Sequence, residues 1–167
     1  KPWMDKISKK NKMISNRIKK LKKILNQLKL DGYVVPKNDE YFSEYSNRDW
    51  LKKISNFSGS AGYAVILKKK NYLFVDNRYT IQAGIESGKK FQIVDYKKII
   101  NCKIFKNLTL GLNPQFFTSH QIKNFFLTNN NVKLVRSKLI DKIFKNKNNE
   151  KKPFFSINDK VAGENHF

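Results

Sequence analysis

Residues 57–79, FSGSAGYAVILKKKNYLFVDNRY, decide how the chain folds. Gly59 and Gly62 flank two small residues at the start of this stretch. Two short apolar runs follow, 64–67 and 72–75, separated by lysines and an asparagine. Runs of this length, rich in β-branched and aromatic residues and joined by a short polar segment, are typical of a β-hairpin. The stretch therefore predicts a glycine-bearing turn that leads into two antiparallel strands.

A helix is expected to follow the second strand directly. Asp76 and Asn77 favour helix starts, because their side chains accept hydrogen bonds from nearby backbone N–H groups. The apolar residues between Arg78 and Ser87 mix spacings of two and four, so their periodicity leaves helix and strand open. The cap signal and the closing Gly88 favour the helix.

The rest of the chain alternates between helix and strand patterns. Apolar residues at 14, 18, 21, 25 and 28 predict an amphipathic helix with a solvated lysine face, and binding to a membrane surface is the alternative use of that face. Gly32 is expected to end this helix in the left-handed conformation. Further strands are expected at 33–35, 91–94, 108–112 and 132–135, and further helices at 48–57, from Thr118 to the asparagines 129–131, and at 139–144. The sum is an α/β domain with a mixed six-stranded sheet flanked by helices.

The length of 167 residues, with 40% hydrophobic content, suits one domain with a core. Residues 1–12 form a polar, lysine-rich N-terminal extension, and the α/β domain is assigned to 13–145. Residues 146–167 begin as an asparagine-rich connector and hold too few apolar residues to fold alone. They are expected to be a linker and the start of a truncated second domain, so the chain is interpreted as a fragment of a longer polypeptide.

The location of the protein is expected to be cytoplasmic. No run approaches the length of a membrane span, and residues 1–12 lack the apolar segment of a secretory signal. The single cysteine, Cys102, cannot form an internal disulfide, and no Cys/His spacing suits a structural zinc site.

Charge is the most unusual feature of the composition. The 35 Lys and Arg residues exceed the 13 Asp and Glu residues, which gives a net charge of +22. Such a charge indicates a nucleic-acid partner. However, base recognition favours arginine, and the arginines are limited to Arg17, Arg48, Arg78 and Arg136. Joint enrichment in lysine and asparagine is also what an A+T-biased coding sequence produces, so a free-standing basic nucleic-acid-binding module is kept only as the alternative function.

Carboxylates gather at Asp39, Glu40 and Glu44, among aromatic residues. Such a cluster can hold a metal or perform acid/base chemistry, but no histidine joins it here. Capping of a helix first turn is the favoured interpretation, with a ligand-facing role as the alternative.

The remaining reactive side chains lack catalytic partners. His120 is expected on the surface or in a cap, and Cys102 as an inert, half-buried thiol. Ser58 and Ser60 lie beside glycines without the G-x-S-x-G spacing of a nucleophile. No catalytic or metal-binding residue is therefore assigned, and the chain alone is expected to be inactive.

Several motifs together resemble a known family. Phe57–Gly62 followed by Asp76–Tyr79, with Tyr33–Pro36 and Asp39–Tyr45 upstream, is similar to the first N-terminal domain of three-domain Xaa-Pro aminopeptidases of the creatinase/prolidase type. The resemblance covers residues 14–163. It implies the creatinase N-terminal fold with its ribonuclease H-like motif.

The resemblance also implies an activity for the parent protein. Enzymes of this family are metallopeptidases, hydrolases that remove the residue preceding a penultimate proline. Their carboxyl-terminal domain, absent here, holds two divalent metals, usually manganese, through two Asp, one His and two Glu. The implied partners are the chain's own downstream domains, proline-containing peptides and a second copy in a homodimer. The present domain would be non-catalytic, shaping the substrate cleft and supporting dimerisation.

Arg78 is the candidate substrate-binding residue. It follows a strand end and begins a helix, so its guanidinium could pair with a carboxylate or a peptide carbonyl at the rim of the sheet. A salt bridge with Asp76 or Glu44 is the alternative. In the resembled family the matching arginine faces the substrate cleft. Tyr41 stands where that family has His, and Asn77 stands where it commonly has Gly, at a turn that Asn is expected to keep by adopting a positive φ.

Overall fold

The structure is a computed structural model that describes residues 2–43, 48–100, 102–144, 158 and 161. Six strands form one mixed sheet in the order β4-β3-β2-β1-β5-β6. The strands are β1 (Gly32–Pro36), β2 (Gly62–Leu67), β3 (Asn71–Val75), β4 (Gln92–Asp95), β5 (Thr109–Leu112) and β6 (Asn131–Leu134). The six-stranded α/β fold is thus confirmed. The expected linker and second-domain start, 146–167, lie almost entirely outside the described residues.

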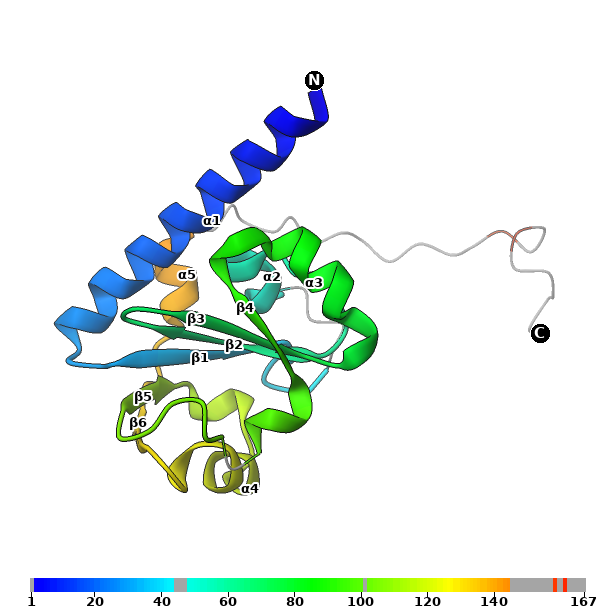
Figure 1. The fold of residues 1–167 in the computed structure, drawn as a ribbon. Helices are drawn as coiled ribbons and strands as arrows, with labels where there is room; N and C mark the ends of the chain where they lie inside the picture. The colour runs from blue at the N-terminus through cyan, green and yellow to red at the C-terminus, as the bar shows by residue number, and fades with distance from the viewer. Residues whose placement is uncertain (1, 44–47, 101, 145–157, 159–160, 162–167) are drawn as a thin grey trace.

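Helices cover both faces of the sheet. They are α1 (Pro2–Gln27), α2 (Trp50–Ser55), α3 (Thr80–Ser87), α4 (Ser119–Ile122) and α5 (Leu139–Ile143). Figure 1 shows α1, α2, α3 and α5 on one side of the sheet and α4 on the other. The expected helix before Gly88 is confirmed as α3, which ends where Gly88 adopts a φ of 59°.

The predicted hairpin lies in the interior of the sheet. β2 pairs antiparallel with β3, with Ala64 opposite Leu73 and Val65 opposite Tyr72. β2 also pairs antiparallel with β1, and every residue of both strands is buried. Strands covered on both faces have no polar side to alternate with, which explains why they read as continuous apolar runs.

Helix α1 is longer than its apolar stripe indicates. It begins at Pro2 and spans 26 residues, so the polar extension is helical from Pro2 onward. Proline suits a first helical turn and lysine is a good helix former, which favours this early start. The stripe itself is buried as expected, at Ile14, Ile18, Leu21 and Leu25. Figure 1 shows the amino-terminal half of α1 projecting past the sheet.

The expected left-handed cap at Gly32 is wrong. Lys29 adopts the left-handed conformation instead, with a φ of 53°. The N–H of Leu30 then donates to the carbonyl oxygen of Leu25 at 2.9 Å, as in a Schellman motif. Gly32 lies inside β1, where a Cβ atom would come within 2.4 Å of Leu67 Cδ2. The glycine therefore allows close packing between strands rather than a helix end.

The helix expected after Thr118 begins with a capping box. Thr118 Oγ1 accepts a hydrogen bond from the Gln121 N–H at 3.1 Å, and Gln121 Oε1 accepts one from the Thr118 N–H at 2.9 Å. After four residues α4 passes into a π-helical turn, Lys123–Leu127. This turn buries Phe125 and Phe126 beneath the sheet.

Candidate functional site

The loops that carry the candidate residues lie at one end of the sheet, where most of its strands finish. β4 is parallel to β3, β5 and β6 are parallel to β1, and β2 alone runs the other way. The carboxyl ends of five strands therefore lie at one end of the sheet. The start of β2 lies at the same end, between the ends of β1 and β3. Ligands of open α/β sheets bind outside the carboxyl ends of strands. We call the loops 37–43, 56–61 and 76–79 at this end of the sheet the carboxyl rim.

Arg78 lies at the carboxyl rim in the 3₁₀ turn Asn77–Tyr79, between β3 and α3. Asp76 Oδ1 accepts hydrogen bonds from the Arg78 backbone N–H at 3.0 Å and from Arg78 Nε at 2.9 Å. The predicted ion pair with Asp76 is therefore present, whereas Glu44 lies outside the described residues. The Arg78 side chain is nevertheless 78% exposed. Asp76 thus holds one edge of the guanidinium, whose Cζ lies 5.7 Å from the Tyr79 ring centroid, and most of the side chain faces solvent.

The Asp76–Arg78 pair stabilises the charge on both partners. The Arg78 side chain, followed by the Arg78 backbone N–H, lowers the pKa of Asp76. The hydrogen bond from Asp76 raises the pKa of Arg78. Arg78 therefore presents a permanent cation whose direction is set by a neighbouring anion.

The positive φ expected at Asn77 is wrong. Among the described residues other than glycine, positive φ angles occur at Lys29, Phe42, Asn56 and Asn107. The Asp76 carboxylate caps a right-handed 3₁₀ turn that needs no left-handed residue. The turn into α3 is therefore built by Asp76 rather than by Asn77.

A hydrogen-bonded group joins α3 to the loop 56–61, and we call Ser58, Gln82 and Glu86 the α3 clamp. Glu86 accepts from the Ser58 backbone N–H at 2.7 Å and from Ser58 Oγ at 2.7 Å. Gln82 Nε2 donates to Ser58 Oγ at 3.0 Å and to Glu86 Oε1 at 3.1 Å. A second link joins the hydroxyls of Ser60 and Tyr79 at 3.0 Å. Both ends of the segment that carries Arg78 are thus fixed to one loop.

The α3 clamp predicts an acid-sensitive contact. Burial raises the pKa of Glu86, but the hydrogen bonds from Ser58 and Gln82 outweigh it and leave that pKa below its usual range. A carboxylate with a lowered pKa stabilises the folded state above its unfolded pKa, and this stability is lost as the pH falls through the folded pKa. From about pH 6 to about pH 3, the unfolding free energy of a Glu86→Gln variant should fall less than that of the parent chain, as measured by urea denaturation. Equal losses would contradict the assignment.

The loop 37–43 is organised by its first carboxylate. Asp39 Oδ1 accepts from the N–H groups of Tyr41 at 2.9 Å and Ser43 at 3.0 Å. No helix follows within 39–43, so the predicted capping of a helix first turn is wrong there, and Asp39 instead closes a turn of the loop. Glu40 pairs with Lys138 at 3.3 Å. Tyr41 is 84% exposed, so a large aromatic side chain stands free at the carboxyl rim.

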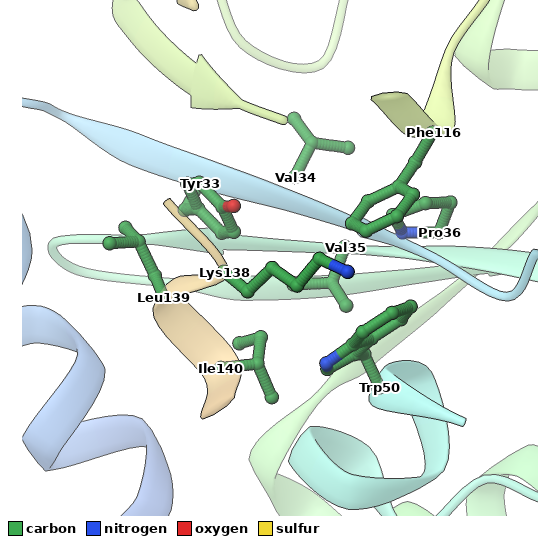
Figure 2. Close-up of a pocket in the computed structure, with 9 residues that line it drawn as sticks. All are labelled: Tyr33, Val34, Val35, Pro36, Trp50, Phe116, Lys138, Leu139 and Ile140. Carbon is green, nitrogen blue, oxygen red and sulfur yellow. The ribbon is translucent and has the colours of Figure 1, made fainter. Parts of the chain in front are cut away.

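A small cavity lies behind this loop, between β1, α2 and α5 (Figure 2). Its volume of about 10 Å³ is on the order of that needed for one water molecule, so it cannot hold a peptide. Figure 2 shows the Lys138 side chain extending toward Trp50, and Lys138 Nζ lies 5.6 Å from the Trp50 ring centroid. Trp50 Nε1 donates to Asp141 Oδ1 at 2.9 Å. These contacts hold α5 against α2. The Glu40–Lys138 pair connects them to the loop 37–43.

Other reactive side chains lie away from the carboxyl rim or lack partners for catalysis. Within the described ranges, no group of three or more His, Cys, Asp and Glu side chains could hold a metal ion. The expected half-buried Cys102 is fully buried, and burial raises the pKa of its thiol. His120 Nε2 lies 2.8 Å from Asn124 Nδ2 on the surface of α4. Among the helices described, none has the length and apolar character needed to cross a membrane.

The fold is shared with peptidases whose structures have been solved. The X-prolyl aminopeptidase from Caenorhabditis elegans, a cytosolic enzyme with a di-nuclear active site, superposes on 78% of this chain with a TM-score of 0.66 and 21% identity. This chain covers 25% of that enzyme. The N-terminal domain of the peptidase PepQ from Mycobacterium tuberculosis matches 76% of this chain, at a TM-score of 0.57 and 16% identity, and 97% of that domain is covered.

Sequence relatives point the same way. A probable Xaa-Pro aminopeptidase P of Laccaria bicolor is 39% identical over 82 residues, and Xaa-Pro aminopeptidase 1 of Dictyostelium discoideum is 36% identical over 86 residues. Each alignment covers 48% of this chain and 13% of the relative. The chain thus spans only a small part of the length of the curated relatives that it matches.

The family model of the Creatinase/Prolidase N-terminal domain matches residues 17–143, which contain all six strands of the sheet. This range is well over half of the 167 residues. The chain therefore belongs to the Creatinase/Prolidase N-terminal domain family.

Proposed function

We propose that this chain is the non-catalytic amino-terminal domain of an Xaa-Pro aminopeptidase, in which the carboxyl rim shapes the substrate cleft and Arg78 binds the peptide. The observation that carries the proposal is the placement of Arg78. Its side chain is 78% exposed at the carboxyl rim, and Asp76 holds the Nε edge of its guanidinium. The names of the relatives supply the class of enzyme.

The proposed substrate suits this arrangement. A penultimate proline makes the scissile bond a tertiary amide, which general peptidases cleave poorly. A guanidinium with one edge fixed still presents further N–H donors to a peptide carbonyl or a terminal carboxylate. Such charge-assisted hydrogen bonds fix the position of the peptide, and the rim limits the length of chain that can enter.

The metals of the proposed enzyme belong to its downstream domain. The described residues do not fit a two-metal centre, because they contain no cluster of carboxylate and histidine ligands. The resembled family places two divalent ions, usually manganese, in the carboxyl-terminal domain. This domain would contribute binding and orientation to the reaction rather than metal ligands.

Two isoleucines of α3 support contact with further protein. Ile81 and Ile85 lie one turn apart and are 79% and 74% exposed, whereas Ala83 on the opposite face is buried. This outward apolar pair begins one turn after Arg78. We assign it to the downstream domains of the longer polypeptide, with the second copy of a homodimer as the alternative occupant. A cytoplasmic location is part of the same proposal, and the cytosolic enzyme of Caenorhabditis elegans supports it.

Peptide hydrolysis tests the proposed function. A longer polypeptide that carries this domain, supplied with Mn²⁺, should release the first residue of Ala-Pro-Ala, while the chain alone should release none. Cleavage of Ala-Ala-Ala by the longer polypeptide should be slower by about 100-fold or more, because the site is built for proline. Equal cleavage of both peptides, or cleavage of neither, would contradict the proposal.

The nucleic-acid alternative has one specific observation in its favour. A groove of about 390 Å³ is lined by Lys69, Lys70, Lys89 and Lys90, with Asn71, Phe91 and Gln92 completing it. It lies at the opposite end of the sheet from the carboxyl rim, where β3 and β4 begin. We expect only weak binding to duplex DNA, with a Kd of about 10⁻⁴ to 10⁻⁶ M that is independent of sequence and weakens steeply with salt. Sequence-specific nanomolar binding at physiological salt, measured by fluorescence anisotropy, would instead favour the alternative.

A further inference from the structure

Helix α3 is short, and only two of its residues are buried. It has eight residues, of which Ala83 and Ser87 are buried, while Ile81 and Ile85 face outward. Isolated helices shorter than about 12 residues are unstable in water. The polar contacts at the surface of α3 therefore add to its packing on β3 and β4 in setting its orientation.

The α3 clamp supplies these contacts from a rigid base. Ser58 directly follows Phe57, whose side chain has 0% exposure. A Cβ atom at Gly59 would lie 2.2 Å from the Phe57 ring, so loop and ring are in close contact. The same ring packs edge-on against Tyr79, with centroids 5.9 Å apart. Ser58 thus offers Glu86 a donor pair whose position is set by the core.

We propose that Glu86 is a positioning residue for Arg78 and acts through Ser58 and α3; this inference rests on the proposed function. Glu86 lies eight residues after Arg78, roughly 12 Å along a helix axis, so it acts at a distance. Its two charge-assisted hydrogen bonds to Ser58, each 2.7 Å long, hold the far end of α3. Release of that end lets the segment tilt, and a misplacement of about 1 Å at a binding group can reduce a rate by about 100-fold.

A double-mutant cycle in the longer polypeptide tests the coupling. With Ala-Pro-Ala as substrate, Glu86→Ala should lower kcat/KM by about tenfold, whereas in an Arg78→Ala background the same change should alter it by less than about twofold. The loss should appear largely in KM, because Arg78 contacts the bound peptide. Glu86→Gln keeps an oxygen that can accept the Ser58 N–H, and it should restore kcat/KM to within about threefold of the parent.

Asp31 provides a matched control. Its carboxylate also accepts from a backbone N–H, that of Thr109 at 2.9 Å, and from a side chain, Lys68 Nζ at 2.8 Å. It precedes β1, at the end of the sheet opposite to the carboxyl rim. Asp31→Ala should lower stability and leave KM within about twofold, which separates positioning from general destabilisation. In the chain alone, hydrogen exchange in 77–87 should speed up in Glu86→Ala and stay unchanged in Asp31→Ala.

The outcomes distinguish the inference from the proposed function. If Arg78→Ala leaves kcat/KM unchanged, the substrate-binding role of Arg78 fails, and the positioning role fails with it. If Arg78→Ala lowers kcat/KM but Glu86→Ala does not, only the positioning role is overturned. Equal losses from Glu86→Ala with and without Arg78 would also overturn it, because Glu86 would then act independently.

Discussion

Replacing Phe57 by alanine is expected to lower the free energy of unfolding by about 3–5 kcal/mol, the range for deleting a buried aromatic ring. Phe57 has 0% exposure, and its ring fills the space below Gly59 and beside Tyr79. The variant leaves a cavity that the surrounding residues are expected to fill only in part. Urea denaturation of the chain measures the loss, which is a large share of the total stability of about 5–15 kcal/mol for a domain.

Ile85→Ala is the control for Phe57→Ala. Ile85 is 74% exposed, so its truncation should change the unfolding free energy by less than about 0.5 kcal/mol. Phe57→Leu retains much of the buried volume and should fall between the two. A loss below about 1 kcal/mol in Phe57→Ala would show that the ring does not support the carboxyl rim as described.

Arg78→Ala is expected to lower kcat/KM of the longer polypeptide for Ala-Pro-Ala by about 100-fold. Hydrogen bonds to a charged group contribute about 1.5–3 kcal/mol, and each 1.4 kcal/mol corresponds to a factor of about ten. The Asp76 carboxylate loses its side-chain partner in this variant, but it keeps the hydrogen bond from the backbone N–H of residue 78 and remains partly exposed to water. Steady-state kinetics with a series of peptide concentrations separates the effect on KM from that on kcat.

Two variants sharpen the Arg78 measurement. Arg78→Lys keeps the positive charge but loses the planar fork, and it should recover only part of the activity. Arg136 is exposed after β6, at the end strand of the sheet, and Arg136→Ala should leave kcat/KM within about twofold. Equal effects of Arg78→Ala and Arg136→Ala would point to the net charge of the domain instead of a specific contact.

Features that depend on neighbours in the sequence could be predicted. The hairpin of β2 and β3 is such a feature, because both strands and their connection lie within one continuous stretch, and Ala64 opposes Leu73. The end of α3 at Gly88 is another, since only a few residues set it. Local signals of this kind are strong where turn chemistry and apolar runs agree.

Features that depend on the fold could not be predicted. The end of α1 is set where the Leu30 N–H donates to the Leu25 carbonyl oxygen and the Leu30 side chain is buried in the core. A left-handed Lys29 is therefore tolerated, and Gly32 is left for strand packing. Ser58 and Glu86 lie 28 residues apart, and isolated polar residues carry no periodicity that would pair them. The place of Arg78 after a strand end and the resemblance both indicate it from the sequence, whereas its supporting clamp depends on the three-dimensional arrangement.

The central claim is that this domain presents Arg78 to a peptide held in a cleft completed by downstream chain. A crystal structure of the longer polypeptide with Ala-Pro-Ala bound tests it most directly. We predict an Arg78 nitrogen within about 2.7–3.2 Å of a peptide oxygen, with Asp76 still bound to Nε. An Arg78 side chain that faces bulk solvent, with the peptide bound elsewhere, would contradict the account.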